Sequence, residues 1–153
     1  MRKRGFTLIE LIVVIGIISI TSAILILRFN IIDQFKIRNE KNTLINDIYY
    51  ARSKALLTDM DTSINIFKDS NRKNKYTISQ AYSNSLTTMD TKERNLNYLY
   101  FKSAGEKITF KPSGTVAKAG TILLFYELGG EERRLKITYA VGGEINVSDE
   151  KAN

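Results

Sequence analysis

The side chains that could do chemistry here are carboxylates, hydroxyls and bases, because the sequence contains no histidine and no cysteine. The commonest general base and transition-metal ligand is therefore missing, and so is any thiolate or disulfide. Asp59 and Asp61 flank Met60 but supply just a fragment of the oxygen ligands that a calcium loop needs, and the pair Glu131 and Glu132 has no partner motif. We therefore predict no catalytic residues, no metal site and no cofactor.

One carboxylate is distinguished by its position. Glu10 precedes a run without a single charged residue from 11 to 27. A charge in the apolar part of a membrane helix costs on the order of 2.5–3.5 kcal/mol on insertion scales, so such a carboxylate indicates a function and calls for a cationic partner. From Phe6 to the end of the run there are about 22 residues, close to the roughly 20 that a helix needs to cross a bilayer. We expect residues 6–28 to form a transmembrane segment or a filament core.

The N-terminus is compatible with three kinds of mature protein. Small residues at 21–23 could provide the cleavage site of an ordinary secretory signal, which would release an exported protein such as an enzyme. A single-pass anchor would fit the length and the basic residues at 2–4, which the positive-inside rule keeps in the cytoplasm, but it gives no reason for Glu10. The third possibility is a chain that is cut after Gly5. Its net charge would be +4 instead of +7, because 20 basic residues would remain against 16 acidic ones.

Residues 2–11, Arg-Lys-Arg-Gly-Phe-Thr-Leu-Ile-Glu-Leu, resemble the class III signal of type IV prepilins and type II secretion pseudopilins. The resemblance implies that a prepilin peptidase cleaves between Gly5 and Phe6 and methylates the new N-terminus at Phe6. Glu10 then becomes the fifth residue of the mature chain, where the family keeps a glutamate. Pairing of Glu10 with a neighbouring subunit's N-terminal amine would neutralise two charges where water is scarce. Thr7 could support the same amine, or could cap the helix.

The resemblance also implies where the protein works. The subunit would be held in the cytoplasmic membrane by one span, with its N-terminus in the cytoplasm, and would then enter a cell-surface or envelope filament. The expected partners are the prepilin peptidase, other pilin or pseudopilin subunits and an assembly platform in that membrane. Many major pilins have a kinking proline in the anchor, whereas the single proline here is Pro112. A straighter or differently bent helix is therefore expected.

Helical periodicity continues beyond the apolar run. Residues that can face a core recur every three or four positions, and charged and amide residues lie between them: Ile37, Lys41, Leu44, Ile48, Ala51 and Ala55. No proline or glycine lies between Gly16 and Asp59. The pattern predicts one continuous helix over residues 6–58, and the alternative is two helices with a bend near Asn30.

The rest of the chain has the alternation and turn residues of β-structure. We predict a hairpin from residues 63–67 and 76–78 around a turn at 69–71, followed by a surface loop at 79–94. Later strands are predicted at 96–101, 107–110, 121–126, 135–139 and 144–147, with glycine pairs at 129–130 and 142–143 as hairpin turns. The predicted fold is α+β: a leader at 1–5, a helix at 6–58, and a domain at 59–153 in which one antiparallel β-sheet packs against the helix, as in the pilin fold.

Three softer matches extend the resemblance to most of the chain. The stretch Ala51-Arg52-Ser53-Lys54-Ala55 is similar to the helix end of GspH/FimT-type pseudopilins, residues 108–115 resemble that group's strand and glycine turn, and the strands around 142–143 resemble its C-terminal hairpin. They imply a minor pilin or minor pseudopilin. The alternative is that the alanines pack the helix on the sheet and that Arg52 is a solvated charge.

Two basic clusters support an alternative function. One surrounds the first predicted hairpin, near Tyr76, and the other precedes the strand that ends at Tyr139. Basic patches with aromatic side chains can bind the DNA backbone, and some FimT-type minor pilins are implicated in DNA uptake. Acidic neighbours dilute both clusters. The alternative is thus a competence-type minor pilin, whose candidate DNA-binding residues are Lys73, Arg72, Arg133 and Arg134.

Overall fold

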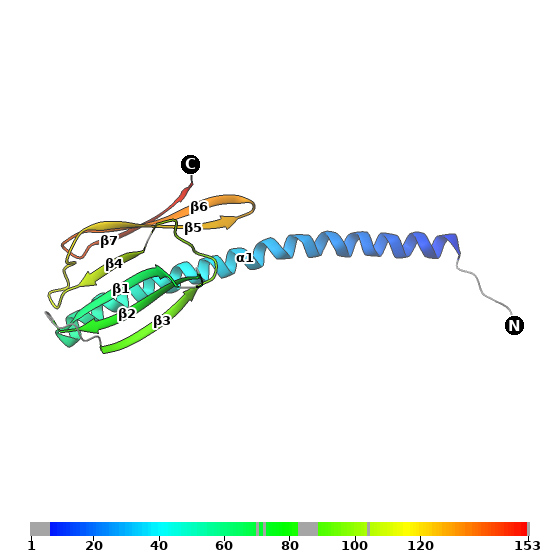
Figure 1. Cartoon of the computed structure of the whole chain (residues 1–153). Coiled ribbons are helices and arrows are strands. Elements are labelled where there is room, and N and C mark those ends of the chain that lie inside the picture. The colour runs from blue at the N-terminus through cyan, green and yellow to red at the C-terminus, as the bar shows by residue number, and fades with distance from the viewer. Residues whose placement is uncertain (1–6, 70, 72, 83–88, 104, 153) are drawn as a thin grey trace. The chain divides into compact units, whose positions relative to one another are not determined.

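The computed structural model describes residues 7–69, 71, 73–82, 89–103 and 105–152 (Figure 1). The chain divides into two units, residues 1–35 and residues 36–153, which are considered separately below. The helix α1 (Leu8–Thr58) supplies all the regular structure described in the first unit, and its second part belongs to the second unit. The predicted continuous helix is confirmed, because helical structure runs without interruption through Asn30.

Both ends of α1 have local explanations. At its start the carbonyl oxygen of Thr7 accepts hydrogen bonds from the backbone N–H groups of Glu10 (3.1 Å) and Leu11 (3.3 Å). At its end Asp59 adopts a left-handed conformation with φ of +54°, which short polar side chains tolerate and which stops a helix. The helix therefore begins and ends where the sequence provides a cap and a break.

The strands of the second unit form two antiparallel sheets rather than the one sheet that the sequence led us to expect. The four-stranded sheet has the order β3-β2-β1-β4, and the three-stranded sheet has the order β5-β6-β7. The strands are β1 (Asp61–Lys68), β2 (Asn74–Ala81), β3 (Met89–Leu96), β4 (Glu106–Phe110), β5 (Gly120–Leu128), β6 (Glu131–Tyr139) and β7 (Ile145–Lys151). The two predicted glycine pairs join β5 to β6 and β6 to β7.

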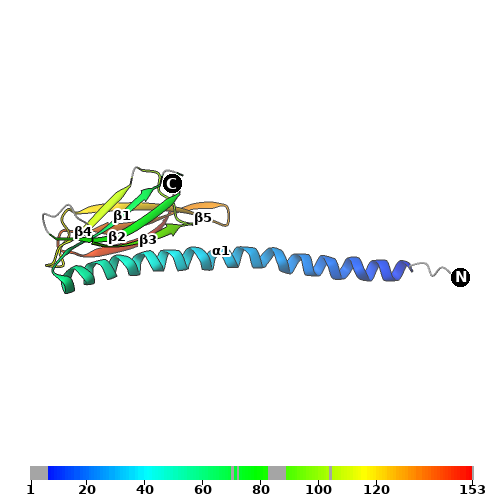
Figure 2. The ribbon, with the colours of Figure 1, turned by 60° about the horizontal axis from the view of Figure 1, so that its bottom comes forward.

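The second part of α1 and both sheets share one hydrophobic core, and Figure 2 shows this part of the helix running along the strands. The predicted helix face is confirmed: Ile37, Leu44, Ile48, Ala51 and Ala55 are all buried. Alternate residues of the strands complete the core, since successive side chains of a strand point to opposite faces of the sheet. These residues include Ile64, Ile66, Ile78, Ile108, Ile122, Leu124, Leu135 and Ile137.

The predicted surface loop at 79–94 is wrong over most of its described length. Ser79 to Ala81 continue β2, and Met89 to Arg94 belong to β3, which pairs with β2 from Leu96 opposite Asn74 to Met89 opposite Gln80. Residues 83–88 lie outside the described part. Strand β3 is an edge strand of charged and polar residues, so it lacks the apolar alternation by which a strand is recognised.

The predicted strand at 96–101 is also wrong. Of its six residues, Leu96 alone belongs to a strand, as the last residue of β3. The backbone N–H groups of residues 97, 98 and 99 donate to the side chain of Glu40 on α1 instead of to another strand. Tyr100 makes an isolated bridge to Phe125 of β5. A side chain distant in the sequence therefore takes the hydrogen bonds that a strand would have needed.

Candidate functional site

The first unit presents the residues that the leader resemblance singles out. Gly5 and Phe6, the predicted cleavage site, lie outside the described residues. The hydroxyl of Thr7 accepts a weak hydrogen bond from the N–H of Glu10 at 3.4 Å, which is the capping role considered above. The carboxylate of Glu10 is exposed and makes no ion pair with any described residue.

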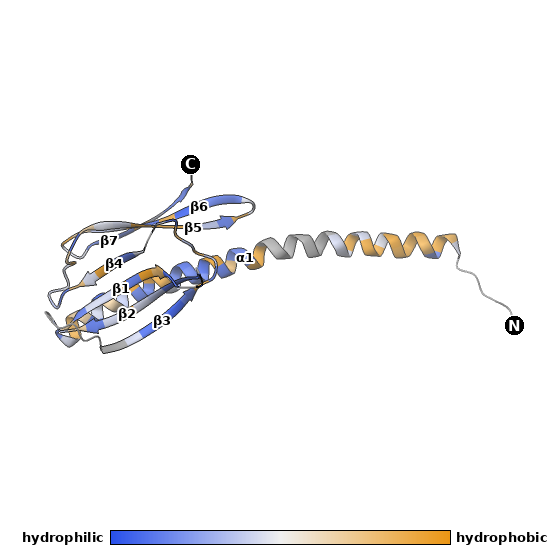
Figure 3. Ribbon diagram, in the orientation of Figure 1, coloured by the Kyte–Doolittle hydropathy of each residue, from blue (hydrophilic) through white to orange (hydrophobic). Residues whose placement is uncertain are grey.

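Large apolar side chains cover this part of the helix without a partner in the described chain. Ten of them between Leu8 and Ile20 are exposed, from 44% for Val14 to 77% for Leu8. They include five in succession at 11–15, so they surround the helix, and the apolar part of α1 stands out in Figure 3. Over the residues described, no helix reaches the combination of length and hydropathy needed to span a bilayer.

The basic residues predicted to bind DNA have different surroundings. Lys73 is exposed just before β2, and Arg72 lies outside the described residues. In β6, Arg134 donates two hydrogen bonds to Glu150 of β7, at 2.6 and 2.9 Å, while the Nε of Arg133 is buried without a hydrogen-bond partner. The second basic cluster is therefore partly neutralised within its own sheet.

Three of the four acids in the two acidic pairs make structural contacts. Asp61 forms an ion pair with Lys111 at 2.7 Å, and Glu131 forms one with Lys151 at 3.1 Å. Glu132 accepts hydrogen bonds from the Tyr100 hydroxyl at 2.6 Å and from a lysine ammonium, and these bonds hold the pKa of Glu132 below its ordinary value. Within the described ranges, no three potential metal ligands lie together.

A buried carboxylate on α1 connects the helix to the four-stranded sheet. Asp47 accepts a hydrogen bond from the Tyr76 hydroxyl at 2.7 Å and pairs with Arg94 at 2.8 Å. Burial and the hydrogen bond to Asp47 raise the pKa of Tyr76 above its ordinary value. Asp47 and Tyr76 are buried, whereas Arg94 reaches the surface. The pairing of Asp47 compensates the cost of burying its charge.

A second polar cluster connects α1 to the three-stranded sheet. Lys41 forms an ion pair with Asp149 of β7, and the hydroxyl of Tyr126 also donates to Asp149. Burial alone would raise the pKa of Asp149, but the bonds from Lys41 and Tyr126 hold it below its ordinary value. The Lys41 ammonium lies 4.6 Å from the centre of the Tyr126 ring. The helical spacing predicted Lys41 on the buried face but indicated no partner for its ammonium group.

Arg52 is part of the packing of the globular unit, not a free surface charge. Its Nε donates to the carbonyl oxygen of Gly114 at 3.0 Å. Gly143, in the turn between β6 and β7, lies against the same carbonyl, because a Cβ on Gly143 would come within 2.2 Å of that oxygen. Arg52 thus bonds the helix to the turn at Gly114, and the alternative of a solvated side chain is wrong.

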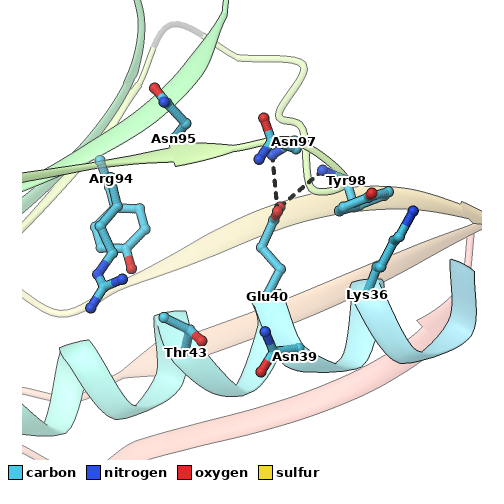
Figure 4. Close-up of a pocket in the computed structure, with 9 residues that line it drawn as sticks. Lys36, Asn39, Glu40, Thr43, Arg94, Asn95, Asn97 and Tyr98 are labelled. Carbon is cyan, nitrogen blue, oxygen red and sulfur yellow. Dashed lines mark hydrogen bonds between the residues drawn. The ribbon is translucent and has the colours of Figure 1, made fainter. Parts of the chain in front are cut away.

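A cavity of about 470 Å³ lies between α1, the end of β3 and the loop that follows (Figure 4). Glu40 lies within it and accepts hydrogen bonds from the N–H groups of Asn97 (3.0 Å), Tyr98 (3.0 Å) and Leu99 (2.8 Å). Lys36 lies beside Tyr98, with its ammonium 5.8 Å from the ring centre. Neither the hydrogen bonds of Glu40 nor this cavity were expected from the sequence. The residues that meet here come from segments of the chain more than 50 residues apart.

Comparison with known families agrees with both halves of the resemblance. Residues 1–26 match the prokaryotic N-terminal methylation motif, and residues 40–143 match the family described as type II transport protein GspH. Neither the curated proteins nor the solved structures contain a match to this chain. The second match covers about two thirds of the sequence and includes both sheets apart from the last strand. The chain therefore belongs to the GspH family of pseudopilins and carries the N-terminal methylation motif of pilin-like proteins.

Proposed function

We propose that this chain is a structural subunit, a minor pseudopilin or minor pilin, which is cut between Gly5 and Phe6 by a prepilin peptidase and methylated at Phe6. It then assembles through its N-terminal helix into a type II secretion pseudopilus or a related type IV filament. The proposal includes no catalytic role. The family match and the methylation motif support this assignment.

The observation that carries the proposal is the apolar surface of the first unit. Ten exposed large side chains from Leu8 to Ile20 need an apolar environment, because exposed apolar patches of this kind mark membrane or protein contacts. Before assembly a membrane can supply that environment, with residues 6–28 as the single span and the N-terminus in the cytoplasm. After assembly the helices of neighbouring subunits can replace the lipid.

Glu10 specifies which groups of neighbouring subunits would pair in this contact. Its carboxylate is exposed next to the new N-terminus and has no partner ion in the described chain. Cleavage would create an α-amino group four residues before it, and the amine of one subunit can pair with Glu10 of the next. Neither charge is then left alone in apolar surroundings, so assembly removes a cost that the separate subunit bears.

Mass spectrometry of protein extracted from membranes and from sheared filaments tests the processing step. The expected mass is that of a chain beginning at N-methyl-Phe6, and a strain without the peptidase should retain residues 1–5. A functional filament containing uncleaved chains would overturn the proposal. A mature N-terminus at Ile24 would do so as well, because it would indicate removal of an ordinary secretory signal.

A matched pair of variants tests assembly. Glu10→Gln removes the charge without changing the size of the side chain, and we expect normal cleavage but little incorporation into filaments. Asp33→Asn makes the same change at another exposed acid of α1 and should incorporate normally. Incorporation of both variants at the wild-type level would contradict the pairing of Glu10 with a neighbour's amine.

A further inference from the structure

One edge of the three-stranded sheet is covered by a segment that is not a strand. We call this segment, residues 97–102 after β3, the strap. The backbone N–H of Tyr100 in the strap donates to the carbonyl oxygen of Phe125 in β5 at 2.8 Å, and the carbonyl oxygen of Tyr100 accepts from the N–H of Phe125 at 2.6 Å. These two bonds make one hydrogen-bonded pair of an antiparallel ladder. The outer edge of β5 therefore already binds a partner as a neighbouring strand would.

The strap leaves most of this edge unpaired. Backbone groups of alternate residues point to the same side of a strand, so Thr121, Leu123 and Glu127 direct theirs to the same edge as Phe125. In the described part of the chain, no residue outside the three-stranded sheet bonds to the backbone of these three. Their side chains are exposed, and that of Leu123 is a large apolar group with 39% exposure.

The other sheet edges have protection that the sequence of β5 lacks. Strand β3 has three successive charged residues at 92–94, and β7 ends with three at 149–151. Charged side chains of this kind discourage pairing at an edge. On β4, Phe110 is bridged by Val116. Residues 120–126 of β5 carry no charge, and uncharged stretches of β-forming residues associate readily when they are exposed.

Side chains from two other elements hold the strap in place. Glu40 of α1 accepts hydrogen bonds from the backbone N–H groups of residues 97–99 at 2.8–3.0 Å (Figure 4). Glu132 of β6 accepts from the Tyr100 hydroxyl at 2.6 Å and from the Lys102 ammonium at 2.9 Å. The attachment of the strap can therefore be weakened at Glu40 or at Glu132 without any change in β5.

The edge of β5 is complementary to itself. In an antiparallel pair of two copies that is centred on Leu124, the nine residues of the strand overlap completely. Leu123 of one copy then lies opposite Phe125 of the other, and Thr121 lies opposite Glu127. No like charges face each other, and the pairing of an aromatic with an apolar side chain, which stabilises a ladder, occurs twice.

We propose that the strap is an autoinhibitory cover, and that its release lets the β5 strands of two copies of this chain pair antiparallel about Leu124. That pair needs the backbone groups of Phe125, which Tyr100 occupies while the strap is in place. The strap and a second copy therefore compete for one edge. This competition involves the globular unit alone, so it is independent of the assembly proposed for the apolar surface from Leu8 to Ile20.

Disulfide cross-linking of the full chain in dodecyl maltoside micelles tests this competition. The natural chain has no cysteine, so Thr121→Cys/Glu127→Cys introduces its only thiols. Within one chain the two positions lie about 20 Å apart along the strand, too far for a disulfide, whereas the proposed pair places them opposite each other. With a mild oxidant, adding Glu40→Ala to this double variant should make the linked dimer form at least about tenfold faster, because pairing follows the population of released strap.

Two more variants separate release of the strap from other effects of Glu40→Ala. Glu132→Ala leaves α1 unchanged and removes the side-chain bonds of Tyr100 and Lys102, so it should also accelerate linking, by about threefold or more. Leu123→Lys, added to Glu40→Ala, should return the rate to that of the chain with its strap held, because a charge on the edge opposes pairing. Circular dichroism melts check that each variant keeps the fold.

Thr91→Cys/Asn95→Cys is the matched control on the edge of β3. Symmetric pairing about Glu93 would bring these thiols together but would also place like charges opposite each other, so linking should stay slow with or without Glu40. Association of the apolar helices in micelles affects all variants alike, and the ratio of rates is the readout. The proposal is overturned if neither Glu40→Ala nor Glu132→Ala accelerates the β5 link. It is equally overturned if the β3 thiols link as fast as those of β5, or if Leu123→Lys leaves the rate high.

Discussion

Replacement of Glu40 should release the segment that follows β3. The Oε1 of Glu40 accepts from the N–H groups of Tyr98 and Leu99, and the Oε2 accepts from Asn97, at 2.8–3.0 Å. A hydrogen bond to a charged group contributes roughly 1.5–3 kcal/mol, and half-exposed bonds lie at the low end of that range or below it. For Glu40→Ala we expect the opening free energy of this segment to fall by about 2–4 kcal/mol. Glu40→Gln can keep the two bonds to its oxygen, so a loss of about 1–2 kcal/mol is expected.

Hydrogen exchange of the Leu99 amide in the full chain measures this effect directly. A loss of 2–4 kcal/mol in opening free energy corresponds to exchange about 30-fold to 1,000-fold faster, at 1.36 kcal/mol per factor of ten. Glu127→Gln changes an exposed acid on β5 and should leave the rate within about twofold. A change of less than about threefold for Glu40→Ala would refute the view that this carboxylate holds the segment in place.

Three further predictions follow from other contacts. Gly143→Ala should lower the free energy of unfolding by at least about 2 kcal/mol, because φ is +84° and the new Cβ would meet a backbone carbonyl, whereas Gly142→Ala meets nothing within 4 Å and should be near neutral in thermal melts. The hydrogen bond to Glu132 raises the pKa of Tyr100 to about 12. The stabilising contribution of this bond is therefore complete below about pH 10 and is lost as the pH rises to about 12. Glu132→Gln should lower the pKa of the Tyr100 phenol toward its ordinary value, as followed by ultraviolet absorbance. If the competence alternative holds, gel shifts at low salt should detect DNA binding that Lys73→Ala weakens, with a salt slope smaller by about one; no shift at low salt would end that alternative.

The helix could be predicted because the residues that specify it are close together in the sequence. Apolar spacing every three or four residues specifies a buried face whatever it packs against, and the face from Ile37 to Ala55 is buried as that spacing requires. The strands with alternating patterns, β4 to β7, were located for the same reason. Their partition into two sheets was not, because pairing between distant strands leaves no mark on the spacing within either strand.

The errors fall where long-range contacts override a local pattern. Residues 96–101 have the composition of a strand, yet Glu40, more than 50 positions earlier, takes the N–H groups that a neighbouring strand would have used. Strand β3 has the composition of a loop, yet pairing with β2 makes it a strand. In the candidate site, the leader could be recognised from contiguous residues, whereas the cavity around Glu40 could not, because its lining combines separate segments of the chain.

Polar side chains on α1 also explain how one helix holds two different sheets in fixed positions. An apolar face alone would allow the helix to slide along a sheet, since one Ile packs nearly as well as the next against a flat apolar surface. Specific hydrogen bonds do not tolerate it, because a slip would leave a buried donor or acceptor without its partner. Lys41 engages the three-stranded sheet, Asp47 the four-stranded sheet, and Arg52 the turn at Gly114. These anchors occupy one stretch of about three turns of helix, which specifies the arrangement of the globular unit without using any residue of the apolar surface from Leu8 to Ile20. That surface is thereby left free for the assembly contacts that we propose.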